Sequence, residues 1–404
     1  MTNLKKYSYF NYFYIALTIL WSPLQGTILT FDGKGRTLLA LTILAFIANY
    51  NKSHFRKLIF SKPIVFWLVW CLYSTINTYI KGYDNPDIPF LYFVVNQVFC
   101  PFVIMSVSAY EYLKNSRIFL KIALIVFLVY SFIGAFVMDI GYIAQEEGVE
   151  NVNTLGNALA LNVMMIIFFT GVMYCHKYLS LKYTIVLIIF AIGIIVVSAT
   201  RKALGAGIIM IVALIVSHIK WNLGNLIKLL FPTLMLLVSL NYIISNTQMG
   251  ERLQSLEEAS DNYNKKYNIE GNFFLEAMGD RAPQYILGTE LFIESPVTGI
   301  GLNNFVRESG YPYCLHTEYM VQICECGIIG CILFIAFYTS VIKRLIRRIK
   351  YSSDDKKKVI MMLGGIVALL FIYLTSWSFN MCNYFVVLGC IVGYIHSNKL
   401  KRIN

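Results

Sequence analysis

The feature that most constrains this chain is a succession of long apolar segments, each of about 16–23 residues, separated by short polar stretches. The hydrocarbon core of a bilayer is about 30 Å thick, so one helix needs roughly 20 apolar residues to cross it. Only 14% of the residues are charged and 57% are apolar, whereas a soluble domain has roughly 25% charged residues. The sequence therefore predicts an all-α polytopic membrane protein and excludes a soluble enzyme with one large core.

The apolar segments predict about twelve transmembrane helices around one large loop. They lie at about 9–31, 37–50, 63–80, 90–109, 118–139, 154–174, 184–200, 203–218, 227–245, 316–342, 359–376 and 382–397. The predicted organisation has three parts: helices 1–9 in residues 1–245, a large periplasmic loop with amphipathic helices in 246–315, and helices 10–12 with a cytoplasmic C-terminus in 316–404.

The distribution of positive charge predicts the orientation of the chain. An even number of spans places both termini on one side, and Lys and Arg are enriched in cytoplasmic loops. With both termini inside, 24 of the 34 Lys and Arg residues fall on the inner side, and eight of these lie between Lys343 and Lys358. The net charge of +12 therefore indicates orientation and attraction to anionic lipid, and not a nucleic-acid partner.

The place where the long loop re-enters the membrane is the first candidate for chemistry, because function often lies in long loops on a rigid scaffold. Of the five histidines, His316 alone is predicted outside. Its unperturbed pKa of about 6.5 suits a general base or acid; the alternative is an ordinary interfacial histidine. Glu318 follows two residues later, and Glu325 is predicted about two turns inside the span, where a carboxylate should be paired, protonated or beside a hydrated cavity.

Three arginines are candidates for anion binding. Arg201 lies in a short turn between two predicted spans, and Arg281 and Arg307 belong to the large loop. The planar guanidinium group binds phosphate oxygens in pairs, so arginines at the membrane edge would suit a lipid-linked diphosphate. The alternative for Arg281 is a salt bridge with Asp280 or Glu276 on its own helix.

The sequence offers little to a metal or a nucleotide. It contains no D-x-D pair, no cluster of histidines and cysteines and no phosphate-binding glycine loop. Cys324 and Cys326 form a C-x-C pair, which we interpret as buried small apolar residues. We therefore expect no cofactor.

Three short patterns occur in order along the second half of the chain. The first is Ser198–Arg201, which closes a predicted span. The second is Arg281 followed by P-x-x-G-x-G-x-x-x-F, which ends at Phe305. The third is H-T-E-Y from His316, followed by E-C-G-I-I-G from Glu325 at the start of a hydrophobic segment. In order, spacing and predicted outer-face placement, the three patterns resemble those of the O-antigen ligase and O-antigen polymerase (Wzy-type) family.

The resemblance implies a GT-C-like helical fold and metal-independent, inverting glycosyl transfer on the outer face of a bacterial inner membrane. The implied donor is an undecaprenyl-diphosphate-linked oligosaccharide. By carry-over, Arg201 and Arg281 would hold the donor diphosphate, and His316 would deprotonate the acceptor hydroxyl. Thr317 stands where the family usually has Asn, which leaves the contact made by that neighbour open.

Four further residues near these patterns are expected to contact substrate: Arg307, Glu318, Tyr319 and Glu325. Tyr319 could stack on a sugar face, and the alternative is a place in the interfacial aromatic belt. The remaining partners that the resemblance implies are membrane lipid and a chain-length regulator protein. No nucleic acid is expected.

Three functions remain open at this point. A polymerase would join the growing chain to another lipid-linked repeat unit, and a ligase would transfer it to lipid A-core in lipopolysaccharide biosynthesis. The richness in Ile, Tyr, Asn and Lys favours the polymerase, as is typical of polysaccharide gene clusters. A flippase for the same lipid-linked glycan is the third reading, although the sequence shows no internal repeat of the kind that transporters often have.

Overall fold

The computed structural model describes nine stretches of the chain, and all regular elements in them are helices. The stretches are residues 2–24, 36–83, 89–134, 153–198, 200–218, 282–311, 313–349, 353–374 and 382–400. The first five contain α1 (Thr2–Leu24), α2 (Arg36–Tyr50), α3 (Ser53–Ile59), α4 (Lys62–Lys81), α5 (Phe90–Phe93), the π-helix η2 (Val94–Phe99), α6 (Cys100–Lys114), α7 (Ser116–Phe132), α8 (Asn153–Cys175), α9 (Leu181–Val197) and α10 (Arg201–His218).

The C-terminal stretches hold short elements followed by three long helices. They are α14 (Ala282–Glu294), α15 (Phe305–Ser309), α16 (Glu318–Met320), the π-helix η6 (Val321–Glu325), α17 (Gly327–Ile349), α18 (Ser353–Tyr373) and α19 (Cys382–Leu400). We call the described residues of 282–325 the cap.

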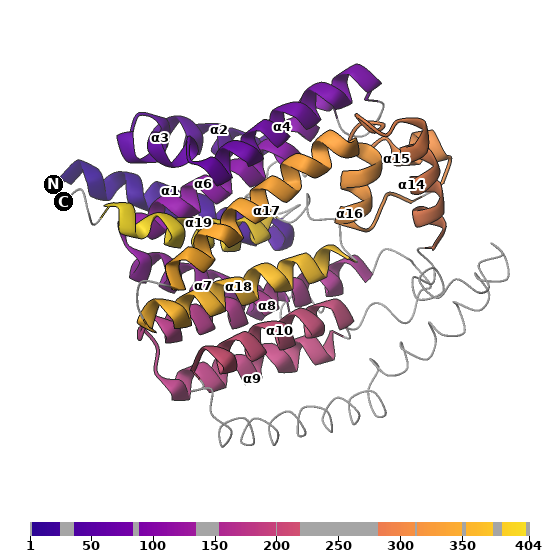
Figure 1. Cartoon of the computed structure of the whole chain (residues 1–404). Coiled ribbons are helices and arrows are strands. Elements are labelled where there is room, and N and C mark those ends of the chain that lie inside the picture. Colours follow the sequence, from indigo (N-terminus) through magenta and orange to yellow (C-terminus); the bar gives the residue numbers. More distant parts are fainter. Residues whose placement is uncertain are drawn as a thin grey trace.

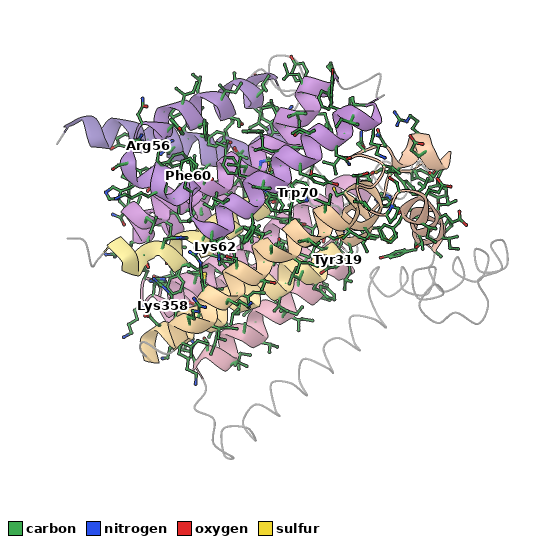
Figure 2. The ribbon with its side chains drawn as sticks, turned by 45° about the horizontal axis from the view of Figure 1, so that its top comes forward. Arg56, Phe60, Lys62, Trp70, Tyr319 and Lys358 are labelled. Carbon is green, nitrogen blue, oxygen red and sulfur yellow. The ribbon has the colours of Figure 1, made fainter. Side chains whose placement is uncertain are left out.

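The long helices run side by side in one bundle, and the cap covers one end of it (Figure 1). α1 begins and α19 ends at the opposite end, which we call the termini end. The basic residues around the turn between α17 and α18 also lie there, and Figure 2 shows Lys358 toward this end and Tyr319 toward the cap. The bundle thus separates a basic end from the end that carries the candidate chemistry.

Close helix contacts fix the neighbours of the cap. α10 and α18 run antiparallel, since a Cβ added to Gly205 would meet Phe371 and one added to Gly364 would meet Ala213. Small residues permit such close approach of membrane helices. Trp67 anchors α4 in the core, where its ring lies 5.1 Å from that of Phe337 in α17.

The structure agrees with the predicted helical class and leaves the number of spans as a prediction. Described helices overlap eleven of the twelve predicted segments, and the ninth, 227–245, lies outside the described residues. By length and composition, 3 helices of the described residues could cross a membrane: Lys62–Lys81, Phe90–Lys114 and Gly327–Ile349. The chain is therefore a helical membrane protein. Of the predicted large loop, residues 282–311 and 313–315 are described, and they contain the helices α14 and α15.

The tenth predicted span differs from the structure at its start. Residues 316–342 are not one helix, because η6 ends at Glu325 and α17 begins at Gly327. Gly327 has a φ of +63°, a left-handed conformation that interrupts a right-handed helix. Glu325, expected two turns inside the span, therefore precedes α17 and belongs to the cap.

Candidate functional site

Two backbone segments meet directly where the cap adjoins the start of α17. Residues 296–301 and 324–329 exchange four backbone hydrogen bonds of 2.9, 2.9, 3.1 and 3.2 Å, two in each direction. We call this contact the glycine junction. It joins the P-x-x-G-x-G pattern to the E-C-G pattern, so the two patterns that the sequence shows separately form one structural unit.

Two glycines make the junction possible. Gly299 has a φ of +72° and Gly327 a φ of +63°, which side chains other than glycine rarely adopt. A Cβ on Gly299 would lie 2.5 Å from the carbonyl of Glu325, and a Cβ on Gly327 would lie 2.5 Å from the nitrogen of Gly299. Any side chain at either position would therefore push the two segments apart.

Glu325 supports the loop that follows the junction. Its buried carboxyl group accepts hydrogen bonds from the backbone N–H of Asn303 at 2.9 Å and of Phe305 at 3.4 Å. Burial raises the pKa of Glu325 to about 8, and the hydrogen bonds from Asn303 and Phe305 oppose this shift. Predicted as a substrate contact, Glu325 is placed by the structure among backbone amides of its own chain.

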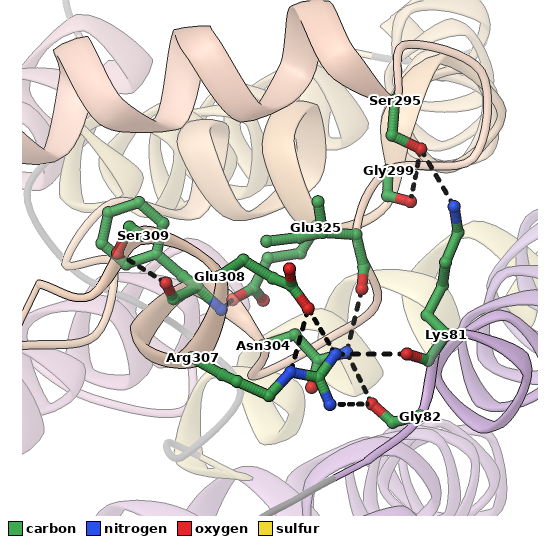
Figure 3. A network of polar contacts seen from close by, with 11 residues as sticks. Lys81, Gly82, Ser295, Gly299, Asn304, Arg307, Glu308, Ser309 and Glu325 are labelled. Carbon is green, nitrogen blue, oxygen red and sulfur yellow. Dashed lines mark hydrogen bonds and ion pairs between the residues drawn. The ribbon is translucent and has the colours of Figure 1, made fainter.

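Arg307 is exposed and bonds to the end of α4. Its guanidinium donates to the carbonyls of Gly82 at 2.7 Å and Lys81 at 3.1 Å and pairs with Glu308 (Figure 3). Those carbonyls lie where a helix runs out of its own hydrogen-bond partners, so Arg307 caps α4. Any contact with substrate would compete with these bonds.

His316 lies at the rim of the cap and is exposed. Its backbone nitrogen donates to the side-chain oxygen of Gln284, 3.0 Å away in the first turn of α14. Arg281 lies outside the described residues; in the sequence it stands three positions before Gln284. The structure thus brings the backbone of His316 to the helix start that Arg281 precedes.

The side chain of Thr317, whose contact the sequence left open, is an N-cap. Its hydroxyl accepts the backbone N–H of Met320 at 3.1 Å and so caps the start of α16. A threonine oxygen at this position is a common N-cap, and here it fixes the backbone that follows His316.

Glu318 and Tyr319 tie α16 to two long helices. The buried carboxylate of Glu318 accepts from Gln322 at 2.7 Å, and the side-chain oxygen of Gln322 accepts from the indole of Trp70 in α4 at 2.8 Å. The hydroxyl of Tyr319 donates to the carbonyl of Leu370 in α18 at 2.9 Å. Figure 2 labels Trp70 and Tyr319, which come from α4 and α16.

Arg201 begins α10, and its side chain lies outside the described residues. One turn later, Gly205 faces Phe371, the neighbour in sequence of the Leu370 that accepts from Tyr319. The start of α10 therefore lies at the cap end of the bundle. The backbone at Arg201, at His316 and at the start of α14, which follows Arg281 in the sequence, thus lies at this end of the bundle.

Sequence reasoning missed the residues of α4 that hold the cap. The hydroxyl of Tyr73 faces the carbonyls of Thr298 and Cys326, and the amide of Asn77 donates to Thr298 as well. Lys81 reaches Ser295 at 3.1 Å (Figure 3). A signal was present, because polar residues at positions i, i+4 and i+8 form one stripe on an apolar helix.

The described residues offer neither a metal site nor a thiol nucleophile at the cap. No group of three or more His, Cys, Asp and Glu residues among them could hold a metal ion. Burial raises the pKa of the Cys314 thiol, and the negative charge of Glu325 raises it further. Cys314 therefore stays protonated near neutral pH, which leaves the imidazole of His316 as the better base at this rim.

Part of the chain is similar to one known protein family. Residues 185–335 match the family model Wzy_C, described as O-antigen ligase. The match covers somewhat more than a third of the chain and includes every predicted site residue and the whole glycine junction, but not α4. No curated protein matches the chain.

Proposed function

Because residues 185–335 match the family model described as O-antigen ligase, we propose that the chain belongs to the O-antigen polymerase and ligase family and is a glycosyltransferase acting on a lipid-linked glycan at the outer face of a bacterial inner membrane. The donor in this proposal is an undecaprenyl-diphosphate-linked oligosaccharide. Both termini would be cytoplasmic, which agrees with the basic residues at the termini end and with the cap at the opposite end.

The observation that carries the proposal is the hydrogen bond between Gln284 and the backbone of His316. It brings the backbone of His316 to the helix start that Arg281 precedes in the sequence, and α10, which begins at Arg201, starts at the same end of the bundle. Both facts support His316 as the candidate base. Helix starts present unpaired N–H groups and positive potential, which favour phosphate. A base and an anion site at one rim are what transfer from a diphosphate donor requires.

In the proposed reaction, an acceptor hydroxyl attacks the anomeric carbon of the donor sugar as the bond from that carbon to the diphosphate oxygen breaks. His316 takes the hydroxyl proton, and Arg281 and Arg201 stabilise the negative charge that develops on the departing undecaprenyl diphosphate. One displacement inverts the anomeric centre. No covalent enzyme intermediate is needed, and no metal ion enters the reaction.

We propose the polymerase activity first, with a second lipid-linked repeat unit as acceptor, because composition favours it. The ligase activity, with lipid A-core as acceptor, is the second candidate and is favoured by the description of the matching family model. The two differ only in the acceptor and share the donor chemistry, so the same cap residues would serve both. The family match argues for either enzyme over a flippase.

Surface lipopolysaccharide from a deletion strain, the complemented strain and a His316→Ala strain, compared on one gel, would test the proposal. Loss of the polymerase should leave lipid A-core capped with a single repeat unit. A core without any repeat unit, together with polymer on the lipid carrier, would identify a ligase. A full ladder in the His316→Ala strain would remove the catalytic role of that residue and favour the transporter.

Metal independence has its own test. Purified protein should keep its transfer activity in excess chelator, since the proposed reaction relies on arginines for charge stabilisation. Activity lost in chelator and restored by a divalent ion would contradict this part of the proposal.

A further inference from the structure

One hydroxyl of α4 faces both sides of the glycine junction. The hydroxyl of Tyr73 lies 3.0 Å from the carbonyl oxygen of Thr298 and 2.8 Å from that of Cys326. These carbonyls belong to the residues just before Gly299 and Gly327, the two glycines with positive φ. A phenol carries a single proton, so Tyr73 shares one donor between the two segments.

A second donor lies one turn further along α4. The side-chain nitrogen of Asn77, which is 7% exposed, is 2.7 Å from the carbonyl oxygen of Thr298 and 3.5 Å from that of Glu325. An amide nitrogen carries two protons, one for each segment. Tyr73 and Asn77 together therefore supply donors to carbonyls of both segments. The carbonyls of Glu325 and Cys326 also accept from the backbone N–H groups of Gly301 at 2.9 Å and Gly330 at 3.2 Å, whereas that of Thr298 accepts from the two side chains. Leaving the Thr298 carbonyl without a donor would be costly.

The junction controls the relative placement of two cap elements. α14 leads into it from one side, and α16 with η6 leads into it from the other. At mid-length the two elements touch, since a Cβ on Gly288 would meet Met320 and Leu315. At the far end, Gln284 holds the backbone of His316. A shift at the junction is therefore passed along both elements to the rim.

We propose that Tyr73 and Asn77 are positioning residues for glycosyl transfer, which hold the glycine junction and thereby align His316 with the start of α14. The inference rests on the proposed function. It extends the site beyond residues 185–335 to α4, a helix that the family match does not include. Neither residue touches substrate in this proposal; each acts through the backbone of the cap.

The kinetic test compares Tyr73→Phe with Thr75→Val. Each variant removes one hydroxyl from α4, but the Thr75 hydroxyl donates to Cys71 within the same helix at 2.8 Å. The probe is the lipid-diphosphate-linked oligosaccharide extracted from the deletion strain, given to purified full-length protein. Tyr73→Phe should lower kcat about tenfold and change KM for the probe less than twofold, because misplaced reacting groups cost rate in the transition state.

Two further readings complete the kinetic experiment. Thr75→Val should keep the wild-type kcat, and Asn77→Asp should lose more activity than Tyr73→Phe, because a carboxylate would face two carbonyl oxygens. A Tyr73→Phe variant with wild-type kcat would overturn the proposal. A loss of kcat that Thr75→Val shares to the same extent would also overturn it, since the effect would then belong to α4 as a whole.

Hydrogen exchange gives a readout that needs no activity. The amides of Ile300 and Gly301 donate across the junction at 3.1 and 2.9 Å, so Tyr73→Phe should speed their exchange about tenfold and Thr75→Val should not. Unchanged exchange rates in Tyr73→Phe would overturn the proposal that Tyr73 holds the glycine junction, whatever the kinetic result. Faster exchange in Tyr73→Phe, together with a wild-type protein that transfers no glycan, would instead overturn the proposed function. The role of Tyr73 in holding the glycine junction would then remain.

Discussion

The two ends of the bundle use the same residue types in different ways. At the termini end, Nε2 of His176 lies 2.9 Å from the hydroxyl of Tyr112, and Nε2 of His396 lies 3.2 Å from Nη1 of Arg344 in α17. The guanidinium of Arg348 stacks 4.4 Å from the ring of Tyr394. Imidazole and guanidinium groups here join helix to helix. At the cap end, His316 is exposed, and its backbone N–H donates to the side-chain oxygen of Gln284.

Backbone conformation separates the two ends as clearly. The five positive-φ glycines among the described residues lie in the cap, at the start of α17 or at the end of α4: Gly82, Gly299, Gly301, Gly310 and Gly327. At the termini end, one described residue, Lys177, has a positive φ. Unusual backbone conformations persist only where the surroundings enforce them, and they gather at functional sites. The comparison teaches that the cap is shaped by its backbone, whereas the termini end is held by side chains.

The largest effect should come from removing the exposed imidazole. His316→Ala should lower transfer by at least about 100-fold through loss of a general base, while the protein inserts at the wild-type level. His176→Ala should keep its kcat, because that ring bonds to Tyr112 at the other end. Turnover of the lipid-linked donor by equal amounts of each variant measures both. Near-normal turnover by His316→Ala would break the contrast between the ends.

The arginines provide the second test of the contrast. Arg281→Ala should lower kcat about 100-fold through loss of charge stabilisation on the leaving diphosphate. Arg348→Ala should keep the wild-type kcat. Its free energy of unfolding should fall by about 1 kcal/mol, because the contact of the guanidinium with Tyr394 is lost. Donor turnover and thermal unfolding separate the two outcomes. If Arg281 instead forms a salt bridge with Asp280 or Glu276, its variant should resemble Arg348→Ala.

A smaller effect is expected from adding one methyl group to the glycine junction. Gly299→Ala should destabilise the cap by about 1–3 kcal/mol, since the new Cβ would meet the Glu325 carbonyl in a strained conformation. The matched control is Gly193→Ala in α9, where a Cβ would meet nothing within 4 Å. Limited proteolysis of both variants reports on the cap. Equal resistance would show that the junction tolerates a side chain.

The smallest effect should be a pH dependence at the termini end. Burial, followed by repulsion from Lys358, lowers the pKa of His176 to about 4, while the unfolded chain titrates near 6.5. Between these values the unfolded state binds more protons, so stability is complete above about pH 6.5 and declines as the pH falls toward 4. Thermal unfolding of the wild type and His176→Gln across this window measures the difference. Parallel curves would contradict the assignment.

Much of the helical layout was open to prediction from the sequence, because each long apolar block has to form a helix in a membrane. The order of the arginine, glycine and histidine patterns suggested a common placement at the outer face, and the structure adds that the second and third patterns meet. The roles of Glu325 and Arg307 were not predictable. A buried carboxylate and an exposed guanidinium look the same in sequence whether they contact a ligand or the chain itself.

Tyr73 and Asn77 show what a sequence pattern leaves undecided. A polar stripe on an apolar helix indicates a partner, but it does not say which segment supplies it. The partner lies more than 200 residues away, as the 225-residue separation between Tyr73 and Thr298 illustrates. Contacts over such distances depend on how all the intervening helices pack, and that information is not local.

By itself, then, the sequence determined that this protein is helical, lies in a membrane and carries its candidate chemistry where the large loop returns to the bundle. Hydrophobic length and residue type are local properties, so they act at each position separately. Only the tertiary structure decided that Gly299 and Gly327 meet, that α17 begins after Glu325, and that α4 holds both segments. The physical reason is that a carbonyl freed by a positive φ needs a donor, and the fold alone determines which side chain supplies it.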